Sequence, residues 1–167
     1  MNLKDLKHEM PEIFETVKKD VRKVKHWHRA GLRLGLAEWE VYPGGFIGGM
    51  HIYPGTDIVM NISPLRIMLK AKKDDLIIWA YTYHILLHEY IHSLGIIDER
   101  QCRNETIKVS KEIFKDENHP ALKLARNGIG EYMPNFHIIY PPPGRRPDNM
   151  TIEIVYGFDR ESQTYFS

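Results

Sequence analysis

The chain has 167 residues, of which 43% are apolar and 27% charged, and this composition suits a globular protein with a hydrophobic core. Its formal net charge of +1 gives no electrostatic reason to expect nucleic acid as a partner. The N-terminus lacks the basic-then-apolar pattern of a secretion signal, no apolar run reaches membrane-spanning length, and the single Cys102 cannot form an intrachain disulfide. We therefore expect a cytoplasmic protein that binds neither nucleic acid nor a membrane.

The first part of the chain predicts a helix followed by strands. Pro11 suits the first turn of a helix that runs to about Arg29, because apolar residues recur at helical spacing in Ile13, Phe14, Val17, Val21 and Val24. The segment 32–41 alternates enough to form a strand. Residues 46–53 and 57–62 flank Pro-Gly-Thr and predict a β-hairpin.

The remainder of the chain is predominantly helical and then irregular. Capping residues and apolar spacing predict helices at about 63–72, 75–94, 99–117 and 121–127, with short strands at 136–140 and 151–156. The helix at 75–94 is apolar nearly all round, so it should be buried and its polar residues should need partners. These elements predict one α+β domain with an upper part at about 1–95 and a lower part at about 96–167.

The helix at 75–94 carries the most informative pattern of the sequence, His88-Glu89-x-x-His92. Residues i and i+4 lie on one face of a helix, so both imidazoles can converge on a single metal ion. Glu89 is rotated by about 100° from His88, which leaves it beside the metal as a general base for a bound water. Two buried histidines that only hydrogen-bond to their neighbours are the alternative interpretation.

A third ligand is expected from the residues that follow this helix. Gly95 can adopt a positive φ and turn the chain back, which would let Asp98 present a carboxylate to the same ion. His119 is the main alternative, and Glu105 and Glu112 on the next helix are further ones. A site that only stabilises the fold usually has four protein ligands, commonly cysteines, so one cysteine favours an open, catalytic zinc site.

His88, Glu89, His92, Gly95 and Asp98 together resemble the extended helix motif of the metzincin clan of zinc peptidases. In that clan the third ligand is usually histidine, and aspartate occurs in a minority branch. The resemblance implies a zincin-like single domain: a twisted mixed sheet, a backing helix, an active-site helix and a smaller helical and irregular lower part. It also implies a tight turn that places a methionine beneath the metal.

Met133 is the residue that fits this turn, because Pro134 and Asn135 follow it. Tyr132 beside it is one expected donor to a developing oxyanion, and His137 and Tyr140 are others. His84 lies one turn before His88 and could be a ligand in a shifted register, a partner of a ligand or a core histidine, of which we favour the last.

These patterns predict a zinc-dependent peptidase that acts on a peptide or protein substrate, with Glu89 as the general base. The strand at 46–53 could bind such a substrate by backbone pairing. Another metal-dependent hydrolase, similar to a ribonuclease or a peptide deformylase, is one alternative. A non-catalytic binding protein with a zincin fold is the other. Oligomeric state and cleavage specificity have no signal in the sequence.

Overall fold

The computed structural model describes residues 1–159 of the chain. The helices of this range are α1 (Leu3–Lys25), α2 (Ser63–Lys70), α3 (Asp75–Ser93), α4 (Glu99–Ile113) and α5 (Pro120–Asn127). Its strands are β1 (Arg33–Ala37), β2 (Val41–Tyr42), β3 (Gly45–Ile47), β4 (Gly49–His51), β5 (Asp57–Asn61), β6 (His137–Ile139) and β7 (Glu153–Val155). This confirms the expected α+β class.

The strands of the described range form two mixed sheets. The larger has the order β4-β5-β1-β7, in which β1 and β5 are parallel and the two outer pairs are antiparallel. The smaller has the order β2-β3-β6, with β3 parallel to β6. The expected hairpin is present as β4 and β5, so β4 lies at one edge of the larger sheet.

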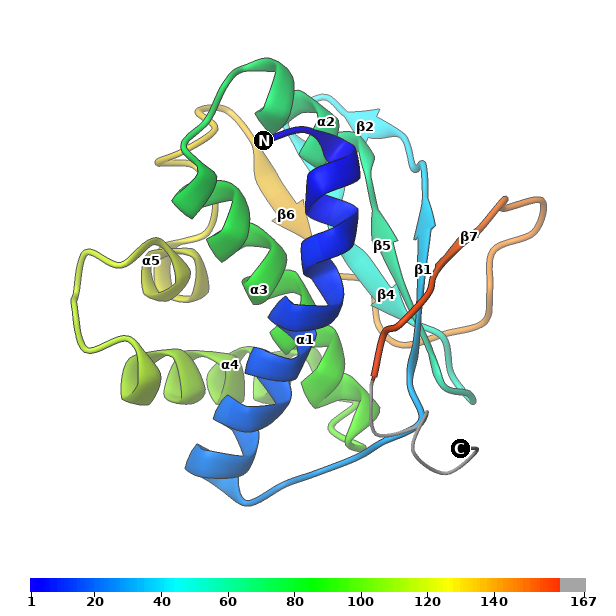
Figure 1. The fold of residues 1–167 in the computed structure, drawn as a ribbon, viewed down its shortest axis with the longest axis vertical. Helices are drawn as coiled ribbons and strands as arrows, with labels where there is room; N and C mark the ends of the chain where they lie inside the picture. The colour runs from blue at the N-terminus through cyan, green and yellow to red at the C-terminus, as the bar shows by residue number, and fades with distance from the viewer. Residues whose placement is uncertain (160–167) are drawn as a thin grey trace.

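Two long helices lie side by side against the larger sheet, as Figure 1 shows for α1 and α3. The apolar core lies between them and the sheet and includes Phe14, Leu34, Ile58 and Tyr90, each fully buried. Helices α4 and α5 pack against α3 on its other side (Figure 1). Helix α3 is thus enclosed on several sides, as its apolar sequence predicts. None of the helices within residues 1–159 has the length and apolar character needed to cross a membrane.

Helix α1 is longer at its start than the sequence analysis expects. Asn2 caps it and forms a capping box with Asp5, so the helix begins at Leu3 and Pro11 lies inside it. The two buried residues Leu6 and Met10 extend its apolar face to this earlier start. The helix ends at Lys25, because His26 takes a left-handed conformation (φ 61°) ahead of Gly31.

A buried ion pair between Lys18 and Asp159 connects the C-terminal part of the described chain to α1. The Lys18 Nζ lies 2.7 Å from Oδ1 of Asp159, and both side chains are almost fully buried. The other oxygen of Asp159 accepts a hydrogen bond from the backbone N–H of Leu32, just before β1. Glu15 also contacts Lys18, at 3.1 Å. Asp159 therefore connects α1, the start of β1 and the segment after β7.

Replacing Asp159 with alanine should lower the free energy of unfolding by about 3 kcal/mol, because the buried Lys18 would lose the carboxylate that lies 2.7 Å from its Nζ. The matched control is Glu153→Ala, which removes an exposed ion pair with Lys7 in the same region. This control should cost less than about 1 kcal/mol. Chemical denaturation of both variants measures the difference, and equal losses would contradict the assigned role of Asp159.

Candidate metal centre

The polar residues of the expected motif lie in the buried second half of α3. His84, His88, Glu89 and His92 are each at most 3% exposed, although the helix around them is apolar. A buried polar side chain without a partner costs free energy, so the arrangement of these four side chains needs an explanation. Hydrogen bonds within residues 1–159 satisfy only some of the polar atoms of these side chains.

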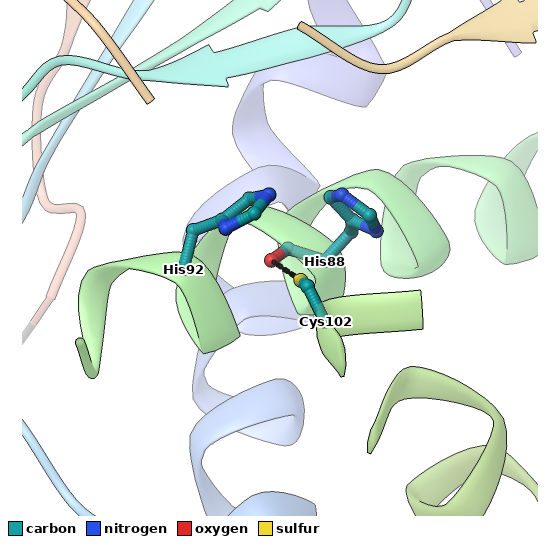
Figure 2. Close-up of side chains that lie close together, drawn as sticks. All are labelled: His88, His92 and Cys102. Carbon is teal, nitrogen blue, oxygen red and sulfur yellow. Dashed lines mark hydrogen bonds between the residues drawn. The ribbon is translucent and has the colours of Figure 1, made fainter. Parts of the chain in front are cut away.

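His88 and His92 point their rings to the same side of α3, with ring centroids 4.8 Å apart (Figure 2). Nδ1 of His92 lies 2.7 Å from the carbonyl oxygen of Ile96. A carbonyl oxygen only accepts hydrogen bonds, so Nδ1 carries the proton. Nε2 of His92 forms a 3.0 Å hydrogen bond with Glu99. Burial acts to lower the pKa of His92, but Glu99 and Glu89 outweigh it and raise this pKa. A metal ion at this position would take the place of the proton on Nε2.

Gly95 makes this hydrogen bond of His92 possible, because its φ of +102° turns the chain back directly after α3. The expected conformation of this glycine is therefore confirmed. The turn brings Ile96 beneath His92 and starts α4 close to the end of α3.

The carboxylate that meets the two imidazoles belongs to Glu99, the first residue of α4. Its Oε1 lies 2.8 Å from Nε2 of His88, and its Oε2 lies 3.0 Å from Nε2 of His92. The contact with His88 lacks the alignment of a hydrogen bond. Burial acts to raise the pKa of Glu99, but the two histidines outweigh it and hold this pKa at about 2.

Asp98, the expected third ligand, has a different role in the structure. Its side chain is exposed and accepts a hydrogen bond from the backbone N–H of Gln101 at 2.9 Å, which makes it the N-cap of α4. A carboxylate engaged in this way faces the first turn of α4. The geometry therefore replaces Asp98 with its neighbour Glu99 at the histidine pair.

The other expected ligands are engaged elsewhere. Nδ1 of His119 accepts a hydrogen bond from Ala121 at the start of α5, and its ring stacks on Phe114. Glu105 forms an ion pair with Lys25 of α1 at 2.8 Å. Glu112 is exposed and contacts Lys115. Contacts between these three residues and the histidine pair are absent within residues 1–159.

Cys102 is a residue that the sequence analysis leaves aside and that the structure brings to the histidines. Its Sγ and one nitrogen each of His88 and His92 lie within 4.8 Å of one another, so these three groups could hold a metal ion. Figure 2 shows the sulfur beneath the rings, directed at the carbonyl oxygen of His88, to which the thiol donates a 3.3 Å hydrogen bond. Burial and the nearby Glu89 and Glu99 raise the pKa of this thiol.

Glu89 lies beside the pair and is almost fully buried. Its Oε2 has no hydrogen-bond partner among the described residues, and its Cγ lies close to Gly49 of β4, where an added Cβ would be 3.6 Å away. Burial raises the pKa of Glu89 and outweighs the histidines, which act to lower it. An ion pair with Arg100 or Arg103 would compete with a role of Glu89 as a base, but within residues 1–159 Arg103 pairs with Glu99 and Glu89 has no arginine partner.

Tyr140 covers the histidines. Its ring centroid lies 4.4 Å from that of His88, and its hydroxyl lies 2.8 Å from Nε2 of His84. His84 is therefore a neighbour of the site that holds Tyr140, and its burial lowers its pKa to about 3 and keeps it neutral. The guanidinium of Arg103 lies 4.6 Å from the centre of the Tyr140 ring.

The turn expected around Met133 is present. The N–H of Phe136 donates to the carbonyl oxygen of Met133, and Asn135 between them has a φ of +71°. Met133 is buried in the core and Tyr132 packs against that core. Among the described contacts, Tyr140 and not Tyr132 is the tyrosine next to the histidines.

The edge of β4 runs past Glu89 but is partly occupied by the chain itself. Gly144 accepts a 2.8 Å hydrogen bond from Tyr53 and donates a 3.3 Å one to His51. Residues 140–144 therefore extend from the ring over His88 to the β4 edge. An extended peptide could pair with this end of β4 only after Gly144 moves.

The groups that converge here fit a divalent metal ion. Two imidazole nitrogens and a carboxylate, all capable of donating electron pairs, meet within 3.0 Å. Both ring nitrogens of His88 and one oxygen each of Glu89 and Glu99 are buried without hydrogen-bond partners in the described range. A cation between the donors would satisfy them better than a shared proton can.

Comparisons with known proteins give no information on this site. No family model, no curated protein and no solved structure matches the chain.

Measured zinc affinities of variants distinguish Glu99, Asp98 and Cys102 as candidates for the third metal ligand. Glu99→Ala should weaken zinc binding by at least about 100-fold, since it removes the carboxylate that contacts both histidines. Asp98→Ala should leave the affinity nearly unchanged and lower stability by about 1 kcal/mol, the usual cost of a lost N-cap. Competition with a chromophoric chelator measures these affinities. A larger loss of affinity in Asp98→Ala or Cys102→Ala than in Glu99→Ala would assign the ligand to that residue instead.

Proposed function

We propose that this protein is a zinc-dependent peptidase of the zincin type, in which His88, His92 and Glu99 hold the ion and Glu89 is the general base. One observation carries the proposal: two imidazole nitrogens and one carboxylate converge beside a second, buried carboxylate whose Oε2 has no partner in residues 1–159. Two histidines and one glutamate are a known catalytic zinc donor set, and it leaves a position for water.

A zinc ion held by these three side chains would supply an activated water and polarise the scissile carbonyl. Glu89 would accept the proton of the attacking water at its free Oε2 and pass it to the leaving amine. The hydrogen bond from His92 to Ile96 would keep the imidazole in the ligating tautomer throughout. The Tyr140 ring lies against His88, and we assign its hydroxyl to hydrogen-bond the developing oxyanion.

The surrounding elements support the zincin interpretation. The motif lies on a helix beneath a mixed sheet, α1 packs behind it, and the antiparallel edge strand β4 passes next to Glu89. The smaller part after Gly95 contributes α4, α5 and the turn at Met133. The strands β6 and β7, which also follow Gly95, return to the sheets and pair with β3 and β1, so the residues after 95 do not form a separate lower part.

The alternative hydrolases fit the site less well. The ribonuclease with a similar histidine motif has glycine where this chain has Glu89, and a net charge of +1 does not favour RNA. In a deformylase-like site Cys102 would be the third ligand. Its thiol already donates to the His88 carbonyl, whereas Glu99 is ionised and in contact with both rings.

A non-catalytic zincin fold is the second candidate, and the cover over the site favours it. Tyr140 lies over His88, and Gly144 occupies one end of the β4 edge. If this cover stayed closed, the protein would bind metal but reach no peptide. The two candidates therefore differ in a single readout, which is whether the zinc-loaded protein cleaves peptides.

Glu89→Gln should keep zinc stoichiometry unchanged and lower peptide hydrolysis about 10²- to 10⁴-fold, because glutamine retains the shape of the side chain but cannot accept the proton. A degenerate peptide library, analysed by mass spectrometry, reports cleavage without an assumed specificity. Glu112→Gln on the exposed side of α4 is the matched control and should hydrolyse like the unmodified protein. Hydrolysis retained in Glu89→Gln would remove the general-base assignment. No hydrolysis by the unmodified zinc-loaded protein would favour the non-catalytic candidate.

A further inference from the structure

A cavity of about 310 Å³ opens beside His88, on the side of α3 that faces α4 and α5. His84 and His88 form one wall, Arg103 of α4 another, and the end of α5 with Arg126 a third. Tyr140 and the strand β6 complete it. The volume is at the small end for ligand sites, so it suits one side chain or one chain terminus rather than an extended peptide.

The charges around this cavity have one sign. Its lining residues include the two cationic side chains Arg103 and Arg126 and three histidines, His84, His88 and His137, and they include no aspartate or glutamate. The acidic partners lie outside the lining: Glu117 pairs with Arg126, and Glu99 lies 3.7 Å from Nε of Arg103. An anionic group that enters would meet two cations and no like charge within the lining.

Both arginines keep donors available. A guanidinium has five N–H donors, and the ion pairs in the described range use only Nη1 of Arg126 and Nε of Arg103. The guanidinium of Arg103 also lies against the ring of Tyr140, another residue of the cavity wall. A guanidinium can bind a carboxylate through two parallel hydrogen bonds.

The position of the cavity indicates which molecule would carry an anionic group that binds in it. His88 lines the cavity and also contacts Glu99 at the candidate metal centre, so a group bound here lies one side chain away from the reacting bond. We propose that this cavity binds a carboxylate of the peptide substrate next to the scissile bond, with Arg103 and Arg126 as the donors. This inference rests on the proposed peptidase function and adds substrate specificity to it.

Two sources can supply that carboxylate, an acidic side chain or the C-terminus of the substrate. Three acetylated tetrapeptides distinguish them: one with glutamate and a C-terminal amide, one with glutamine and an amide, and one with glutamine and a free C-terminal carboxylate. Titration of each into the zinc-loaded full-length Glu89→Gln protein, followed by NMR, measures binding without turnover. A second measurement records cleavage of the same peptides by the unmodified protein.

At least one of the two carboxylate peptides should bind about 10- to 100-fold more tightly than the neutral peptide, the range expected for charge-assisted hydrogen bonds. Arg126→Gln should remove this preference, and because Arg126 has no contact with the metal-site residues in the described range, zinc content should stay unchanged. Arg103→Gln should have the same effect on binding. Arg100→Gln, an exposed arginine of α4 outside the cavity, is the matched control and should keep the preference.

Equal affinity for the charged and neutral peptides would overturn the inference, as would the absence of binding by all three. A preference that survives both Arg126→Gln and Arg103→Gln would also overturn it. The cleavage measurement separates this inference from the peptidase proposal. Cleavage without any preference for carboxylate would overturn the inference alone. Carboxylate-dependent binding without cleavage would support the cavity assignment and contradict the peptidase function.

Discussion

The arrangement of the whole candidate site depends on two buried imidazoles and one carboxylate that converge on one point. His88 and His92 lie on one face of α3, and Glu99 begins the next helix. Each of the three groups can donate an electron pair, and Nδ1 of His92 is already occupied by Ile96. Two imidazoles and an ionised carboxylate in a buried environment are costly unless a proton or a cation lies between them. The fold therefore retains an arrangement that makes chemical sense when a metal ion balances it.

Several elements of the fold hold the two histidines and Glu99 in their positions. The apolar surface of α3 fixes it between α1, the larger sheet and the lower helices. The positive φ of Gly95 returns the chain, and the cap by Asp98 sets the start of α4 so that Glu99 faces the histidines. Tyr140, which is distant in sequence, packs its ring against His88 and covers it. Helices α3 and α4 thus carry the proposed ligands, while Tyr140 from a Pro-rich segment covers them.

Much of the fold is predictable from the sequence because its signals are local. The periodicity and caps that define α2, α3, α4 and α5 lie within each helix, and the Pro-Gly turn defines the hairpin of β4 and β5. Pro11, taken as a residue of the first turn, predicts too late a start for α1, whereas the capping box of Asn2 and Asp5 marks the actual start. Where a proline and a capping box indicate different starts for one helix, both signals must be compared before the first residue is assigned.

The ligand set was only partly predictable, and the reason is physical. A helix expected to start at residue 99 makes Asp98 its natural N-cap, and one carboxylate cannot both cap that helix and reach the histidines. This signal was present in the sequence and identifies Glu99 once both demands are considered. Cys102 follows Glu99 by three residues, so it shares that helix face. Tyr140 and the arginine-lined cavity depend on how distant segments pack, and no local pattern encodes that.

X-ray absorption spectroscopy at the zinc edge of the metal-loaded protein identifies the atoms that bind the ion. We expect one zinc ion per chain with nitrogen and oxygen neighbours at about 2.0–2.1 Å and the outer-shell scattering of two imidazoles. We expect no sulfur neighbour at about 2.3 Å. A zinc–sulfur distance would show that Cys102 and not Glu99 completes the site, and a protein that retains no zinc would contradict the metal centre itself.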